Sequence, residues 1–331
     1  MVLSPRRAAE IEHFDVFNGD ADGICSLHQL RLADPRDSTL VTGLKRDIGL
    51  LARVAARDGD VVTVLDISLD RNREALQSLL DRGAQVEYFD HHYSGTIPTH
   101  PRLRAHLDDS GTICTSALVN RHLRGRFAIW AAVGAFGDAF DAAARQIAGP
   151  LGLDEARVAS LRELGVSINY GAYGETNADL LVHPLDLYRI VSRYADPFEL
   201  VEREPLIDRL TRERTADMER AVATVALHAN GTGDVWILPD AAWARRVSGT
   251  FANRLALLHP QHAHAVLTPL ACGSFMVSVR SARGCGPSAL EFCRPFDGGG
   301  RATAAGIDRL EAARLDSFVA AFEAAWGAPA A

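Results

Sequence analysis

The segment Phe14-Asp15-Val16-Phe17-Asn18-Gly19-Asp20-Ala21-Asp22-Gly23 decides the fold of this chain. Residues 14–17 have the pattern of a short strand, and residues 18–23 form a loop of glycine, asparagine and aspartate. Ile24 to Leu32 then follows with a helical pattern. A strand that passes through a short polar loop into a helix is typical of the βαβ unit of a parallel sheet. The segment therefore predicts an α/β domain at the start of the chain.

Two more predicted strands end in acidic residues. The β-branched run Val61–Leu65 leads into Asp66, and Val86–Phe89 leads into Asp90-His91-His92. A helical pattern over 71–80 connects them. In an open parallel sheet, ligands bind beyond the carboxyl ends of the strands. We therefore expect these acids to converge on one crevice, although they lie far apart in the sequence.

A further acid, Asp138, follows an apolar helical stretch at 128–135. Carboxylates that crowd into one crevice raise one another's pKa, and divalent cations relieve this repulsion. Oxygen-rich sites with an imidazole suit manganese or magnesium better than zinc. Two ions roughly 3.5–4 Å apart would activate a water molecule and neutralise a phosphoryl transition state. The predicted metal ligands are Asp20, Asp22, Asp66, His91 and Asp138.

A purely structural interpretation exists for parts of this pattern. An Asp-x-Asp pair in a glycine-containing loop, such as Asp20 and Asp22, also serves as a turn or a helix cap. Asp90-His91-His92 is harder to explain in this way, because three polar residues directly after a buried strand serve no core.

The rest of the chain predicts a helical region and a second domain. Residues 139–226 show helical patterns without a convincing strand, and residues 230–233 are the best linker candidate. Three strands are predicted beyond the linker, at 235–238, 263–267 and 274–279, with helices at 249–258 and 310–326. The fold class is therefore α/β. A parallel-sheet βαβ domain with a helical extension spans 1–228, a smaller C-terminal α/β domain spans 233–331, and the active site is expected in the cleft between them.

Composition limits the classes of function and location. Hydrophobic residues make up 47% of the chain and charged residues 23%, as in globular proteins. The formal net charge of −7 disfavours long DNA as the main substrate. The five cysteines form no CxxC pair, residues 1–10 hold no apolar signal region, and no apolar run is long enough for a membrane span. These features predict a cytoplasmic protein with reduced thiols and no membrane contact.

Taken together, the motifs Asp20-Ala21-Asp22-Gly23, Asp66, Asp90-His91-His92 and Gly137-Asp138 resemble those of the DHH phosphoesterase superfamily. This superfamily includes RecJ-type exonucleases, oligoribonucleases that also cleave adenosine bisphosphate, cyclic dinucleotide phosphodiesterases, exopolyphosphatases and family II pyrophosphatases. The segments 278–281 and 298–306 resemble the DHH-associated C-terminal domain, which binds substrate. The resemblance spans nearly the whole chain, from residue 14 to residue 306.

The resemblance implies a role for each residue of the site. Asp66 would bridge two metal ions, Asp22, His91 and Asp138 would complete the shell of one ion, and Asp20 would serve the other. His92 would face the substrate phosphate, and Asp90 would orient the two histidines, so that Asp66, His92 and Asp90 form the implied catalytic set. Substrate would bind at Arg280, Gly298, Gly299, Gly300 and Arg301. A glycine run also exposes backbone N–H groups to an anion, and arginine offers forked donors to phosphate.

Two positions depart from the superfamily pattern. Val16 stands where many members have a histidine, and Arg301 stands where the glycine run usually continues into histidine. The first departure leaves the shell of one metal ion short. The second adds positive charge and favours a substrate rich in phosphate or carboxylate.

The sequence thus predicts a hydrolase with two divalent cations, manganese before magnesium. Its substrate would be a short phosphodiester or nucleoside phosphate, such as a short single-stranded oligonucleotide or an adenosine bisphosphate. An alternative is a pyrophosphate or polyphosphate hydrolase, and another is a catalytically weak nucleotide-binding regulator. A homodimer is compatible with the sequence, which leaves the cleavage direction and the exact substrate open.

Overall fold

The computed structural model of the chain describes residues 11–230 and 232–326. The packing of the Cα atoms divides these residues into two units, one over 11–172 and 181–211 and the other over 173–180 and 212–326. The boundary falls within helix α9 (Pro205–Val222), earlier in the chain than the predicted linker at 230–233. Residues 1–10, 231 and 327–331, which belong to the predicted ends and linker, lie outside the described residues. The division into domains 1–228 and 233–331 therefore stays a prediction.

The first unit contains a five-stranded parallel sheet in the order β2-β1-β3-β4-β5. Its strands are β1 (His13–Phe17), β2 (Thr39–Val41), β3 (Val61–Leu65), β4 (Gln85–Asp90) and β5 (Leu103–Leu107). The predicted α/β class and parallel sheet are confirmed. The strand β5 was not predicted, because it is a partly exposed edge strand whose arginine and histidine conceal the usual apolar run.

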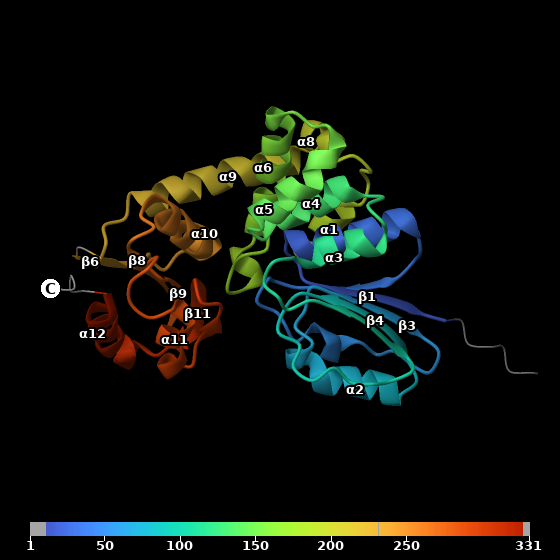
Figure 1. Ribbon diagram of the computed structural model, residues 1–331, viewed down its shortest axis with the longest axis horizontal. Helices are drawn as coiled ribbons and strands as arrows, with labels where there is room; N and C mark the ends of the chain where they lie inside the picture. Colours follow the sequence, from blue (N-terminus) through green and yellow to red (C-terminus); the bar gives the residue numbers. More distant parts are fainter. Residues whose placement is uncertain (1–10, 231, 327–331) are drawn as a thin grey trace, which may run out of the picture. The chain divides into compact units, whose positions relative to one another are not determined.

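Helices cover both faces of this sheet (Figure 1). Parallel strands need crossover connections, and here α2 lies on one face while α1, α3 and α4 lie on the other. The helices are α1 (Ala21–Ala33), α2 (Arg73–Asp81), α3 (Thr115–His122), α4 (Ala128–Gly137), α5 (Asp141–Ala148), α6 (Glu155–Gly171), α7 (Pro184–Val191) and α8 (Pro197–Arg203). The helical character predicted for 139–226 is confirmed by the helices α5 to α9. Among the described residues, no helix is long and apolar enough to cross a lipid bilayer.

The second unit contains a six-stranded mixed sheet in the order β10-β11-β9-β8-β7-β6. Its strands are β6 (His228–Asn230), β7 (Gly233–Ile237), β8 (Ala263–Pro269), β9 (Phe275–Arg280), β10 (Gly299–Gly300) and β11 (Ala304–Leu310). Its helices are α10 (Ala242–Leu258), α11 (Ala289–Cys293) and α12 (Leu315–Trp326). The predicted helix at 310–326 was wrong at its start, because residues up to Leu310 continue β11 in pairing with β9.

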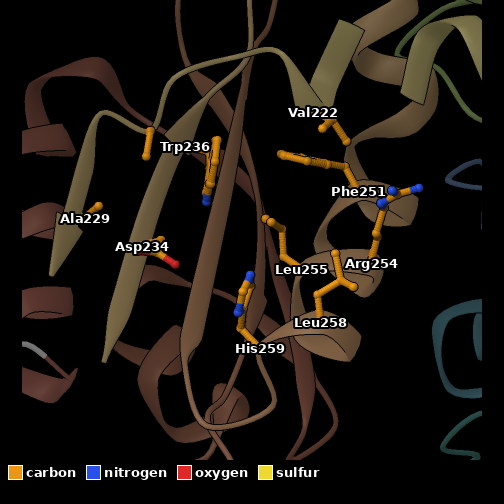
Figure 2. Close-up of a pocket in the computed structure, with 10 residues that line it drawn as sticks. Val222, Ala229, Asp234, Trp236, Phe251, Arg254, Leu255, Leu258 and His259 are labelled. Carbon is orange, nitrogen blue, oxygen red and sulfur yellow. The ribbon is translucent and has the colours of Figure 1, made fainter. Parts of the chain in front are cut away.

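A cavity of about 300 Å³ lies beside β7 and α10 in this unit (Figure 2). Apolar side chains such as Trp236, Phe251 and Leu255 dominate its wall. None of the residues that line it belongs to the predicted substrate set, so the cavity does not bear on the predicted chemistry.

Candidate metal centre

The loop after β1 places two of the predicted ligands. Asp20 is the N-cap of α1, and its Oδ1 accepts hydrogen bonds from the backbone N–H groups of Asp22 and Gly23, each at 3.1 Å. Asp22 lies in the first turn and is fully buried. The capping interpretation of this Asp-x-Asp pair is therefore correct for Oδ1 of Asp20. Oδ2 of Asp20 instead accepts a hydrogen bond from the ammonium group of Lys45.

Asp66 follows β3 in a strained backbone conformation. Its φ of 60° lies in the left-handed region, which costs a non-glycine residue on the order of 1–3 kcal/mol. The Asp66 N–H donates to the carbonyl of Phe89 at 3.0 Å, which ties this turn to the end of the neighbouring strand β4. The strain is therefore held in place by the sheet, as is typical of functional sites.

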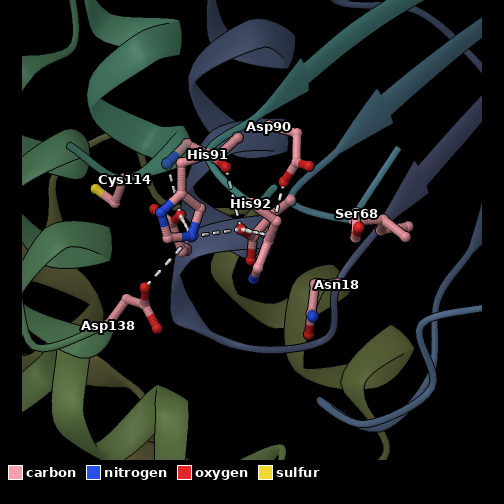
Figure 3. Close-up of polar contacts among 12 residues, drawn as sticks. Asn18, Ser68, Asp90, His91, His92, Cys114 and Asp138 are labelled. Carbon is pink, nitrogen blue, oxygen red and sulfur yellow. Dashed lines mark hydrogen bonds and ion pairs between the residues drawn. The ribbon is translucent and has the colours of Figure 1, made fainter. Parts of the chain in front are cut away.

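His91 lies at the centre of the acids (Figure 3). Its Nε2 is 3.4 Å from Oδ1 of Asp66, 3.5 Å from Oδ2 of Asp138 and 4.0 Å from Oδ2 of Asp22. These carboxylates come from a strand end, a helix C-terminus and a helix N-terminus. The structure thus brings together, around one imidazole nitrogen, residues that are as far apart in the sequence as 22 and 138.

Close packing of α4 against α1 brings Asp138 into this group. Asp138 is the C-cap of α4, directly after Gly137. A Cβ atom at Gly137 would lie 2.3 Å from the Cβ of Ala21 and 2.8 Å from the carbonyl oxygen of Gly165. Only glycine fits there, so the Gly137-Asp138 pair joins a packing requirement to a functional side chain.

The N-terminus of α3 holds Asp22 in position. The backbone N–H groups of Thr115 and Ser116 donate to the two oxygens of Asp22, at 2.7 and 2.8 Å. The hydroxyl of Thr115 also donates to Oδ1 of Asp66 at 3.0 Å. Thr115 was not predicted as a site residue, because a threonine at a helix start carries no signal of its distant partners.

Asp90 and His92 form a pair beside this group. Nδ1 of His92 lies 2.7 Å from Oδ1 of Asp90, which is completely buried, and the imidazole is half exposed. Burial opposes protonation of His92, but the hydrogen bond and charge of Asp90 outweigh it and raise the histidine's pKa. Within the described part of the chain, Oδ2 of Asp90 is a buried acceptor without a hydrogen-bond partner.

Lys45 is a functional candidate that was not predicted from the sequence. Its Nζ lies 2.5 Å from Oδ2 of Asp20 and 2.9 Å from Oδ1 of Asp138, and it also donates to Asn169 at 3.5 Å. A signal was available, since Lys45 comes shortly after β2, at the same edge of the sheet as the other strand ends.

The charges in this group are unevenly balanced. Burial and the charges of Asp20, Asp22 and Asp138 raise the pKa of Asp66 well above its ordinary value. The pKa of Asp22 is also raised, mainly by burial. Burial acts in the same direction on Asp138, but Lys45 and His91 outweigh it and lower its pKa to about 2. Lys45 therefore offsets the negative charge of Asp20 and Asp138. Among the described residues, no lysine or arginine forms an ion pair with Asp66 or Asp22.

This imbalance predicts that, in the metal-free protein, Asp66 and Asp22 contribute less to the free energy of unfolding as the pH rises above the unfolded pKa of about 3.9. Because the pKa values of Asp66 and Asp22 are higher in the folded state than in the unfolded chain, these two carboxyl groups bind more protons in the folded state. The buried His28, whose pKa is lowered to about 4, acts in the opposite direction. The contribution of the two carboxyl groups is complete below the unfolded pKa of about 3.9 and is lost as the pH passes through the raised folded pKa. Asp138, whose pKa is lowered, titrates at lower pH. Urea unfolding in the presence of a chelator measures the slope.

Asp66→Asn is the control for this prediction, because it removes the carboxylate with the most strongly raised pKa. As the pH rises, the variant should lose less free energy of unfolding than the wild type. Manganese should reduce the loss in the wild type in the same way. Equal slopes for the wild type and the variant would contradict the assignment.

The residues predicted to bind substrate lie in the second unit. Arg280 ends β9, and its Nε donates to Oδ1 of Asn253 at 2.7 Å. Ala304 pairs with Arg280 across the sheet, and Arg301 begins the turn that leads into Ala304. The structure therefore places the two arginines on neighbouring segments.

The glycine run has a structural reason at two of its three positions. A Cβ atom at Gly298 would lie 2.6 Å from the carbonyl oxygen of Gly306, and Gly300 has a φ of 141° with the backbone of Ala305 close by. Gly299 has open space where a Cβ atom would lie. Gly298 and Gly300 thus serve the β10–β11 pairing, and Gly299 has no packing requirement for glycine.

Comparison with known proteins places the fold. The structure resembles that of an exonuclease RecJ bound to manganese, with a TM-score of 0.62 and 19% identity over 95% of this chain and 89% of that chain. The chain has the RecJ and DHH-domain fold. RecJ from Thermus thermophilus in complex with Mn²⁺ gives a TM-score of 0.65 at 19% identity, over 95% of this chain and 51% of that one. The DHH domain of a member of a ribosomal-protein family gives 0.62 at 14% identity, over 95% and 86%.

At 14–19% identity, these neighbours show a shared fold. No family model matches the sequence. No curated protein matches it either.

The donor set of this DHH-type fold fits a metal ion. Asp22, His91 and Asp138 offer ligand atoms that lie within 4.8 Å of one another, and so do Asp66, His91 and His92. Carboxylates around one imidazole are the ligands that manganese accepts. Asp20, which was predicted to serve a second ion, hydrogen-bonds to Lys45.

Proposed function

We propose that this chain is a metal-dependent phosphoesterase that hydrolyses a short phosphodiester or a nucleoside phosphate. The observation that carries the proposal is the position of three buried or nearly buried carboxylates within 4.0 Å of Nε2 of His91. Such a group is costly without a cation, because like charges in a low dielectric repel strongly. The fold adds support, since its RecJ neighbours were determined with manganese or magnesium.

We propose two divalent cations, manganese before magnesium, as the cofactors. Asp22, His91 and Asp138 would hold one ion, Asp66 would contact both, and Asp20 would serve the other. When bound, such ions supply a water molecule of lowered pKa and positive charge for the transferred phosphoryl group.

Each remaining side chain then has a definite task. Lys45 pairs with Asp20 and Asp138 at 2.5 and 2.9 Å, and its charge lowers the pKa of Asp138. Asp90 holds the His92 ring by its Nδ1, and the raised pKa of His92 favours the charged imidazolium. Because His92 is half exposed, its other nitrogen is suited to donate to a phosphate oxygen.

The second unit would hold the rest of the substrate. We assign this role to Arg280, Arg301 and the glycines 298–300, within a substrate-binding domain at 233–331 that complements a catalytic domain at 1–228. Guanidinium groups bind phosphate through parallel hydrogen bonds, and the open space at Gly299 lets an anion approach the backbone. The net charge of −7 favours a small substrate or a short single strand over long nucleic acid. The cytoplasm remains the predicted location.

A hydrolysis panel with manganese tests this proposal. It contains dinucleotides, short RNA and DNA, adenosine bisphosphate, cyclic dinucleotides, pyrophosphate and polyphosphate, with Asp66→Asn as the blank. Manganese-dependent turnover of a nucleotide substrate supports the proposal, and turnover of pyrophosphate or polyphosphate alone would replace the substrate class. A folded, manganese-loaded protein that hydrolyses nothing but binds nucleotides would instead be a regulator.

A further inference from the structure

Glu87, His106 and His122 form a second cluster in the first unit, apart from the acids around His91. Glu87 lies on β4, His106 on the neighbouring edge strand β5, and His122 is the last residue of α3. One ligand atom of each lies within 4.8 Å of the others. Glu87 comes three residues before Asp90, so the cluster lies about 10 Å back along the strand from the carboxyl-end crevice.

The sheet register explains why these side chains meet. Phe89 pairs with His106 across β4 and β5, and Glu87 shares the face of Phe89 because side chains alternate along a strand. The ring of Phe89 stacks on His106 with centroids 4.2 Å apart, and its centroid lies 5.2 Å from that of His122 in a T-shaped arrangement. Phe89 thus fixes the two imidazoles next to Glu87.

The geometry suits a tetrahedral metal ion. Nε2 of His106 lies 3.0 Å from Oε1 of Glu87. Two ligands of a tetrahedral zinc ion lie about 3.3 Å apart, given metal–ligand distances of about 2.0–2.1 Å.

The surroundings leave room for a further ligand and limit competing charge. Glu87 and His122 line a cavity of about 140 Å³, with Thr63, Arg31 and Arg36 also in its wall. Arg31 donates to the carboxylate of Asp15 at 2.6 and 2.8 Å, and Arg36 is paired with Asp34. Arg31 and Arg36 therefore have carboxylates of their own. The end of α3 also favours a cation, because the helix dipole is negative there.

We propose that Glu87, His106 and His122 bind a zinc-class divalent ion through three protein ligands, with a fourth position open to the adjacent cavity. Two imidazoles and one carboxylate favour zinc over manganese or magnesium, which prefer oxygen-rich sites. The inference does not rest on the phosphoesterase activity.

The site has a consequence for α3. The C-terminal residue of this helix would be bound to the sheet through the metal, and its N-terminus donates to Asp22 through Thr115 and Ser116. Zinc would therefore stabilise the helix that positions a carboxylate of the other centre. The readout is the thermal stability of the protein, independent of turnover.

His122→Gln tests the proposal, because His122 is exposed and its replacement spares the core. The full chain is dialysed against zinc and its metal content measured, and cobalt is used as a spectroscopic substitute. We expect His122→Gln to bind one zinc ion fewer than the wild type, with zinc affinity at this site at least about tenfold weaker. It should also lose the intense visible bands of tetrahedral cobalt and the zinc-dependent rise in melting temperature.

Two further variants make the result specific. Glu87→Gln should reproduce the loss while keeping a similar shape, and Asp66→Asn should keep the tetrahedral cobalt bands because it changes only the other centre. Equal zinc content and equal cobalt spectra for the wild type, His122→Gln and Glu87→Gln would overturn the proposal. Loss of the bands only in Asp66→Asn would assign the zinc to the centre around His91.

Discussion

Asp66→Asn is expected to lower manganese-dependent hydrolysis by about 10³-fold or more, the largest effect on activity that we predict. Asp66 is proposed to contact both ions, lies 3.4 Å from Nε2 of His91 and is almost fully buried. A neutral amide cannot supply the negative charge that this position requires. The measurement is the initial rate on the substrate that the panel identifies, together with manganese affinity by calorimetry.

Asparagine is the suitable replacement at this position. It tolerates the left-handed backbone of Asp66 better than alanine does, and it retains an acceptor for the hydroxyl of Thr115. The variant should therefore stay folded, and without metal it should unfold no more easily than the wild type near neutral pH. His91→Ala should lose activity in the same way.

Asp58→Ala is the matched control, because its side chain is 81% exposed and lies outside the group around His91. It should keep wild-type activity and metal affinity. If Asp66→Asn hydrolysed substrate at a rate near that of the wild type, the metal assignment would be wrong.

Arg246→Met is expected to destabilise the second unit by about 3–5 kcal/mol, the largest effect on stability that we predict. Nε and Nη2 of Arg246 donate to Oδ2 of Asp217 at 3.1 and 2.8 Å, and Nη1 donates to the backbone oxygen of Asp179. Asp217 is completely buried. Removal of the guanidinium therefore deprives a buried carboxylate of two hydrogen bonds and of the charge that they carry.

Urea unfolding followed by tryptophan fluorescence measures this effect. Three of the four tryptophans, Trp236, Trp243 and Trp326, belong to the second unit. Arg220→Met is the control, since Arg220 also contacts Asp217, at 2.8 Å, but is half exposed and should contribute less than about 1 kcal/mol. The double variant Arg246→Met with Asp217→Leu should recover part of the loss, because it removes both charges. A cost for Arg246→Met no larger than that for Arg220→Met would show that burial does not strengthen the pair.

The sequence alone determined the class of fold and the location of the acids. A strand that ends in Asp66 and another that ends in Asp90 must present these residues at one edge, because parallel strands share the direction of their carboxyl ends. The strand β3 has its predicted bounds. Four of the five predicted ligands lie together, namely His91 with Asp22, Asp66 and Asp138. Local pattern carries this information, since each ligand follows an element that is recognisable by itself.

The tertiary structure decided the partners that depend on contacts between distant elements. Lys45 and Thr115 reach the acids only because β2 pairs with β1 and α3 packs against α1 and β4, and their local sequence does not record those neighbours. The cluster of Glu87, His106 and His122 likewise requires the edge strand β5, which the sequence pattern did not reveal. Side-chain chemistry and strand periodicity are local properties, whereas the pairing of charges across the fold follows from packing.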